Sequence, residues 1–183
     1  VEAGVIKAVV TVAPDGSEGR IECEKVVVCG GQWTRALCAT VGVNVPLVPV
    51  EHQYLITEPI PGVPRSLPTL RDPDRLIYFK EEVGGLVMGG YEPNPIPWAV
   101  AGIPRPFQFQ LLESDFDHFA PSMELAIGRV PALANTGIRT IINGPESFTP
   151  DGNFILGEAP ELKNFYVGAG FNAFGIASGG GAG

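Results

Sequence analysis

The 183-residue sequence has little charge, since Lys, Arg, Asp and Glu together make up 17% of it. Acidic residues outnumber basic ones by 20 to 12, which argues against a nucleic-acid-binding surface, because phosphate contacts require clustered Lys and Arg. No apolar run approaches the ~18 residues of a membrane span, so we expect no membrane segment. The 45% hydrophobic content argues against disorder and predicts a folded core.

Histidine and cysteine are also scarce, with two His and three Cys in the chain. No CxxC pair and no His/Cys/Glu group has metal-ligand spacing, so the sequence predicts no metal site. Cys29 lies in an apolar stretch and is expected to be a buried, inert thiol. His118 lies among acidic residues of an expected helix, and we predict that it is a solvated surface residue.

The first segment has the pattern of an α/β layer. Residues 4–12 and 20–23 predict two strands around a turn, and residues 25–29 predict a strand covered on both faces. That strand stops at Gly30-Gly31, and a helix is expected over residues 33–41. A buried strand followed by glycines and a helix is typical of an α/β fold rather than an all-β sandwich.

The rest of the chain alternates long strands with proline-rich links. Residues 45–57 predict a long strand with one covered face, and residues 76–81 and 86–91 predict a hairpin. The helical spacing of residues 111–129 is interrupted by Pro121, which favours two helices over one. Further strands are expected at residues 138–143, 154–156 and 165–167, with a last helix starting near residue 174.

Two stretches contain residues suited to chemistry. His52 and Tyr54 share one face of the expected strand, which suits holding a small polar substrate and controlling its protonation; the alternative is a buried, hydrogen-bonded histidine. Residues 164–175 run from a strand through glycines to a helix start. Such a helix end favours the N1–O2 edge of a flavin, where negative charge grows on reduction, but small residues there also suit simple helix–sheet packing.

Asp151 and Trp33 each allow a structural and a functional interpretation. Asp151, in a turn rich in Pro and Gly, either caps that turn or hydrogen-bonds a ligand. Trp33, directly after Gly30-Gly31, either shields a ring or fills the core, and core filling is favoured by the residue alone.

Several stretches in series resemble flavin-dependent amine oxidoreductases of the D-amino-acid-oxidase type. Residues 26–33 are similar to the strand–glycine–tryptophan segment of those enzymes. Further stretches resemble the sarcosine dehydrogenase and dimethylglycine dehydrogenase group, and these are residues 51–58, 89–95, 144–151, 157–162 and 168–183. Because they follow the same order and cover nearly the whole chain, together they are far more specific than any one of them.

The resemblance implies a mixed α/β (α+β) fold, in which part of a Rossmann-like FAD-binding domain is interleaved with an antiparallel β-sheet substrate domain. Residues 1–45 would belong to the FAD-binding domain, residues 46–137 to the substrate domain, and residues 138–183 to the return into the FAD-binding domain. The implied cofactor is FAD, and tetrahydrofolate is a further possibility in a full-length protein.

The resemblance also implies an activity. Hydride would pass from the N-methyl carbon of a small amine, such as sarcosine or dimethylglycine, to the flavin, which leaves an iminium. Carried over by position, it assigns catalytic roles to His52, Tyr54 and Tyr91. The cofactor-binding residues that it implies are Gly30, Gly31, Trp33, Asp151, Gly170, Phe171, Asn172 and Gly175.

The sequence begins at Val1 without Met and ends in a glycine run, so we expect a fragment of a longer protein. It lacks the N-terminal strand–glycine–helix that binds the FAD pyrophosphate, the segment with the flavin-tethering histidine, and the folate-binding part. The fragment alone is therefore expected to bind FAD weakly and to be inactive. We predict a cytoplasmic location in a bacterium or a mitochondrial-matrix location in a eukaryote.

The residues leave more than one hypothesis about the function. The same family contains a regulatory subunit of pyruvate dehydrogenase phosphatase, so a non-catalytic interaction protein is the second hypothesis; Gln53, Tyr54 and Tyr91 favour the dehydrogenase group. A third is oxidation of another amine, such as proline or glycine. The choice between dehydrogenase and oxidase, and between O₂ and another electron acceptor, stays open.

Overall fold

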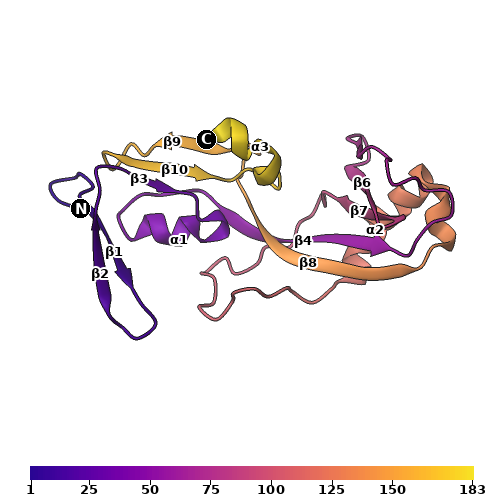
Figure 1. Ribbon diagram of the computed structural model, residues 1–183, viewed down its shortest axis with the longest axis horizontal. Coiled ribbons are helices and arrows are strands. Elements are labelled where there is room, and N and C mark those ends of the chain that lie inside the picture. Colours follow the sequence, from indigo (N-terminus) through magenta and orange to yellow (C-terminus); the bar gives the residue numbers. More distant parts are fainter. The chain divides into compact units, whose positions relative to one another are not determined.

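The computed structural model describes all 183 residues, and the chain divides into two compact units whose elements are labelled in Figure 1. Unit 1 comprises Val1–Pro49, Ala99–Pro104 and Glu146–Gly183, and unit 2 comprises Val50–Trp98 and Arg105–Pro145. The mixed fold class is confirmed, because unit 1 contains a parallel strand pair beside helices and unit 2 is built on antiparallel pairs. The assignment of residues 1–45, 46–137 and 138–183 to cofactor and substrate domains stays a prediction.

Unit 1 contains a three-stranded sheet in the order β3 (Val26–Val28), β10 (Phe165–Ala169) and β9 (Ile155–Glu158). The central β10 is parallel to β3 and antiparallel to β9. The 3₁₀ turn η1 (Gly31–Trp33) and the helix α1 (Thr34–Ala39) follow β3. A separate hairpin of β1 (Ala8–Val12) and β2 (Glu18–Glu22) precedes them, and α3 (Gly175–Ala182) is the last helix.

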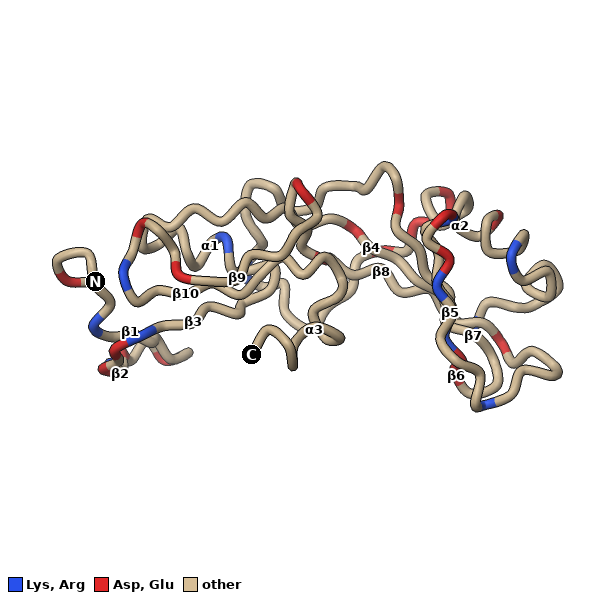
Figure 2. Tube along the Cα trace, turned by 90° about the horizontal axis from the view of Figure 1, so that it is seen from above, with Lys and Arg blue, Asp and Glu red and all other residues tan.

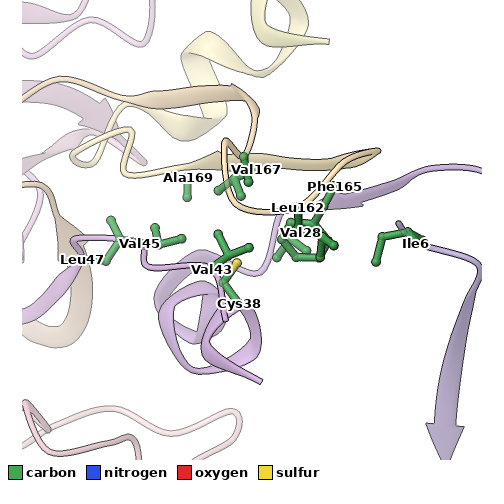
Figure 3. Close-up of a cluster of buried hydrophobic side chains, with 11 residues drawn as sticks. Ile6, Val28, Cys38, Val43, Val45, Leu47, Leu162, Phe165, Val167 and Ala169 are labelled. Carbon is green, nitrogen blue, oxygen red and sulfur yellow. The ribbon is translucent and has the colours of Figure 1, made fainter. Parts of the chain in front are cut away.

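The core of unit 1 is the layer of apolar side chains that α1 and the following segment press against the sheet, as Figure 3 shows. Val28, Phe165 and Val167 contribute from the strands, and Cys38 contributes from α1. Fully burying one side chain of this size stabilises the fold by roughly 1.5–3 kcal/mol, so this layer holds α1 against β3 and β10.

Two expectations about β3 are wrong. Val27 is 64% exposed, so the strand is covered on one face only: Val28 packs in the core with Cys38 of α1, while Val27 and Cys29 line an open cavity on the other face. Cys29 is exposed rather than buried for the same reason. The buried thiol is that of Cys38, and burial raises its pKa.

Unit 2 is built on a five-stranded sheet. In spatial order its strands are β5 (Leu70–Asp72), β6 (Ile77–Glu82), β7 (Gly85–Gly90), β4 (Val48–Thr57) and β8 (Ile138–Phe148). The pairs β5–β6, β6–β7 and β7–β4 are antiparallel. From residue 52 to the end of β4 the buried side chains are Gln53, Leu55 and Thr57, so His52 and Tyr54 lie on the opposite face.

The helix α2 (Phe116–Arg129) covers the buried face of this sheet through Phe119 and Ala126. It is one helix, so the prediction of two is wrong: Pro121 lies in its second turn, where only one backbone hydrogen bond is lost and packing compensates. The helix begins after Asp115, whose carboxylate accepts a hydrogen bond from the N–H of His118 at 2.9 Å. The short 3₁₀ turn η2 (Pro131–Asn135) follows.

The predicted surface position of His118 is also wrong. This residue is half-buried, and its Nε2 is shielded from solvent without a hydrogen-bond partner. The cause is its place in the first turn of α2, directly before Phe119, which is only 3% exposed.

Lys and Arg are interspersed with Asp and Glu along the chain in Figure 2. No group of three or more His, Cys, Asp or Glu side chains has the arrangement of a metal site. None of the helices is both long enough and apolar enough to span a bilayer.

The β6–β7 turn generates a stability prediction. Val83 and Gly84 both have positive φ, 52° and 81°, which is the two-residue type I′ geometry that favours Asn-Gly. Val83 is 54% exposed, so its side chain contributes little packing. Val83→Asn should therefore raise the free energy of unfolding by about 1 kcal/mol, measured by urea or thermal denaturation. Val12→Asn, at an exposed strand position, is the control, and an equal gain there would contradict this explanation.

Candidate functional site

A cavity of ≈ 600 Å³ lies in unit 1 where β3, β8 and β10 end and α3 begins. Its wall is mostly apolar side chains and glycine backbone, with Glu146 and Ser147 as its polar side chains. Four of the predicted cofactor-binding residues line it, namely Gly31, Gly170, Phe171 and Gly175. The size is typical of a small-molecule site.

Glycine serves two different purposes in this cavity. Gly170 has φ +67°, and a side chain there would overlap with that of Thr149, so this backbone must be bare for the chain to pack. No atom lies within 4 Å of the point where a side chain on Gly31 or Gly179 would begin. No contact within the chain demands glycine at these two positions, although the φ of Gly31, +54°, favours it, and the bare backbone leaves room for a ligand.

Asn172 joins two segments of the cavity wall by a hydrogen bond outside the cavity. Its Oδ1 accepts the N–H of Thr149 at 2.9 Å, and its buried amide links the loop after β10 to the turn after β8. Thr149 in turn donates its hydroxyl to the carbonyl of Asn153 at 2.7 Å. Phe171, next along the wall, stacks on Phe154 with centroids 5.3 Å apart.

The remaining predicted cofactor residues do not line the cavity. Gly30 and Trp33 flank Gly31, and Trp33 is 46% exposed rather than part of the core. Asp151 is exposed, and it accepts the N–H of Asn153 at 3.1 Å, a turn-capping contact that lowers the pKa of its carboxyl. Asn172 reaches Thr149 instead of the cavity.

A second group of polar side chains lies in unit 2 on the face of the sheet opposite α2. We call it the unit 2 cluster. Its members are Arg71, Tyr78, Tyr54, Tyr91, His52 and Glu92. Within it, the imidazole of His52 lies 5.5 Å from the ring of Tyr91. Its Nδ1 is 3.2 Å from Oε2 of Glu92, and the two side chains are 12% and 6% exposed.

Strand register explains why these side chains meet. Tyr54 on β4 pairs with Gly89 on β7, and Gly89 pairs with Tyr78 on β6. A side chain on Gly89 would overlap with the ring of Tyr78, so the glycine lets that ring lie across the strand. One row of the sheet thus presents two tyrosines on one face.

The electrostatics of the unit 2 cluster are unusual for a sheet surface. Burial, together with the neighbouring Tyr91 and Tyr54, raises the pKa of Tyr78 to about 12, so this hydroxyl remains a hydrogen-bond donor. Burial alone would raise the pKa of Glu92, but hydrogen bonds from His52 and from the backbone of Gln53 outweigh it and lower that pKa. The guanidinium of Arg71 lies 5.2 Å from the centroid of Tyr91 and adds one positive charge.

The structure brings together the three predicted catalytic residues His52, Tyr54 and Tyr91 on one face, and it adds residues that the sequence did not reveal. Tyr78 could have been found, because the predicted hairpin at residues 76–81 and 86–91 already sets it opposite Gly89. Glu92 lies inside the stretch 89–95 that resembles the dehydrogenases, but no local pattern marks it as the partner of His52. Arg71 gives no sequence signal.

Comparison with known proteins gives a match to one family over the whole chain. Residues 1–183 match the model described as FAD dependent oxidoreductase (DAO). Mitochondrial sarcosine dehydrogenase of Mus musculus is 43% identical over 171 residues, which is 93% of this chain and 18% of that protein. The mitochondrial pyruvate dehydrogenase phosphatase regulatory subunit of Mus musculus is 40% identical over 169 residues, 91% of this chain and 19% of that protein.

Among solved structures, L-proline dehydrogenase from P. horikoshii has a similar fold, with a TM-score of 0.71 and 24% identity. The match covers 96% of this chain and 43% of that one. The chain therefore spans about a fifth of the length of the curated relatives named above.

The cavity geometry yields a second stability prediction. Gly170→Ala should lower the free energy of unfolding by about 3 kcal/mol, because positive φ and overlap with Thr149 both oppose the new side chain. Gly152→Ala is the matched control, with φ +71° but no atom within 4 Å, and should cost only about 1 kcal/mol. Chemical denaturation measures both values, and equal losses would show that the overlap is unimportant.

Proposed function

The chain belongs to the FAD-dependent oxidoreductase family, and we propose that it is part of an enzyme that oxidises the C–N bond of a small N-methyl amino acid of the sarcosine or dimethylglycine type. The observation that carries this proposal is the unit 2 cluster, where one cation, three tyrosines and a histidine–carboxylate pair share a single sheet face. Such a face suits a substrate that is itself a carboxylate and an amine.

The cofactor FAD fits the cavity of unit 1. Gly31 and Gly179 leave open space against bare backbone, while Phe171 supplies a flat apolar wall. Gly170 and Gly175 would also contact the cofactor, and the first turn of α3 would favour partial negative charge on it. When bound, the flavin supplies an acceptor for the hydride that leaves the carbon beside the substrate nitrogen.

The residues of the unit 2 cluster divide the recognition of such a substrate among them. Arg71 would pair with its carboxylate, because a guanidinium matches two carboxylate oxygens at once. The rings of Tyr54 and Tyr91 would form the wall against the methyl groups, and the hydroxyl of Tyr78 would donate a hydrogen bond. His52 would remove the proton of the substrate ammonium, since only the neutral amine has a lone pair that can assist oxidation.

The competing hypothesis is a non-catalytic interaction protein, as the name of one relative indicates for that relative. A regulatory protein has no need for a histidine–carboxylate pair beside tyrosines and an arginine on one face, and their presence favours the enzyme. The electron acceptor and the choice between dehydrogenase and oxidase stay open, and the compartment stays a prediction. One named enzyme relative is mitochondrial, which agrees with the mitochondrial alternative.

Anaerobic titration of the full-length protein tests the function. Sarcosine or dimethylglycine should bleach the flavin absorbance, and Arg71→Gln should raise the KM by about 10–100-fold, since a charge-assisted hydrogen bond contributes about 1.5–3 kcal/mol. Arg139→Gln, which removes an exposed charge in the same unit, is the control and should leave KM unchanged. Absence of bleaching with any N-methyl amino acid would refute the proposal.

The raised pKa of Tyr78 gives a prediction about pH. A tyrosine with pKa about 12 stays protonated until the pH rises toward that value, so its donor function persists through the whole working range. Tyr78→Phe should slow flavin reduction by roughly fivefold, the effect of one neutral hydrogen bond. The shape of the rate–pH profile from about pH 6 to about pH 10 should not change. If the wild-type rate–pH profile has a limb in this range and the Tyr78→Phe profile lacks it, Tyr78 titrates there and the prediction is wrong.

A further inference from the structure

We propose that Glu92 is a positioning residue that holds the proton of His52 on Nδ1 and so makes Nε2 the atom that accepts the proton of the substrate. This inference rests on the proposed function, because it assigns a task to His52 in amine oxidation. It goes further in naming a residue, and a tautomer, that the sequence did not indicate.

The geometry ties Glu92 to the strand that carries His52. Oε2 of Glu92 lies 3.2 Å from Nδ1 of His52, and Oε1 accepts the N–H of Gln53 at 3.4 Å. Both carboxylate oxygens are thus committed to consecutive residues of β4. The segment that carries Glu92 is itself fixed, because the N–H of Tyr91 donates to the carbonyl of Leu76 at 2.8 Å.

The chemistry of the pair determines which imidazole nitrogen carries the proton. The side chain of Glu92 is only 6% exposed, and a buried carboxylate needs hydrogen-bond donors around it. An ionised carboxylate can only accept, so the imidazole nitrogen that faces it must donate. The proton of neutral His52 therefore lies on Nδ1, and Nε2 has the basic lone pair.

Other charged and titratable groups face the same place. The ring of Tyr91 contacts His52 from the segment after β7, and Tyr78 on β6 and Tyr54 on β4 lie close by. Arg71 on β5 is the one formal cation of the unit 2 cluster, and its guanidinium lies over Tyr91. Glu92 is the one carboxylate of the unit 2 cluster and offsets positive charge that develops on the imidazole.

The proton transfer itself balances simply. The N–H bond of the substrate ammonium breaks, its electron pair stays on the substrate nitrogen, and a new N–H bond forms at Nε2 of His52. The products of this step are a neutral amine and an imidazolium. The imidazolium then faces the Glu92 carboxylate at ion-pair distance, so the pair gains attraction as the proton arrives.

A purely structural role for Glu92 would also agree with a hydrogen bond between β4 and the segment after β7. The two roles differ in what they predict. A structural bond contributes to the free energy of unfolding and leaves the imidazole chemistry alone. A positioning residue fixes the tautomer and the pH dependence of the rate.

The experiment compares four forms of the full-length protein: wild type, Glu92→Gln, Glu92→Asp and the control Glu124→Gln, which removes an exposed carboxylate on α2 of the same unit. Nitrogen-15 spectra of histidine-labelled resting protein report the tautomer of His52, which is assigned by its loss in His52→Asn. Stopped-flow flavin reduction with sarcosine over a range of pH reports the proton transfer, and thermal melting reports stability.

We expect Glu92→Gln to abolish the fixed Nδ1–H tautomer, because an amide presents either a donor or an acceptor. It should also slow flavin reduction tenfold or more and move the acid limb of the rate–pH profile. Glu92→Asp should recover part of both effects, and Glu124→Gln should match wild type. A Glu92→Gln protein with the wild-type tautomer and pH profile, whatever its melting temperature, would overturn the proposal.

The two proposals fail in different ways. If sarcosine and its analogues do not reduce the flavin of wild-type protein, the proposed function fails and the catalytic part of this inference fails with it. If they do reduce it, but the tautomer of His52 is the same in wild type and in Glu92→Gln, only this inference fails.

Discussion

The pairing of Tyr54, Gly89 and Tyr78 across three adjacent strands is the constraint on which the unit 2 cluster depends. Because side chains alternate along a strand, this register also sends His52 and Tyr91 to the same face. A shift of one residue in β7 would move Gly89 out of the row and direct Tyr91 to the opposite face. The absence of a side chain at residue 89 therefore has chemical consequences as well as steric ones.

In unit 1, the glycines shape a cavity. Asn172 joins the loop after β10 to the turn after β8, and this cross-link requires glycine at position 170. Once that wall is fixed, Gly31 and Gly179 face open space. The cavity therefore contains glycine that packing requires, at residue 170, and glycines that border empty space, at residues 31 and 179. A flat cofactor would be accommodated beside the second kind.

Family membership alone does not determine chemistry, since relatives of similar identity include a dehydrogenase and a phosphatase regulatory subunit. What favours catalysis is the arrangement of donors and acceptors. Tyr78 brings a hydroxyl donor to the same sheet face, and the carboxylate of Glu92 lies 3.2 Å from Nδ1 of His52. Fixed donors and acceptors around one imidazole are what proton transfer requires.

The sequence alone determined most of the strands, the β6–β7 hairpin, and the common face of His52 and Tyr54, because these follow from two-residue alternation and from turn residues. It did not indicate β5. It failed at Pro121, where the packing of α2 overrode local propensity, and at Cys29, because that face of β3 borders a cavity instead of the core. Only the tertiary structure decided that Glu92 meets His52 and that Arg71 meets Tyr91. The physical reason is that periodicity orients a side chain relative to its own strand, whereas a contact between distant residues depends on how the strands and loops pack together.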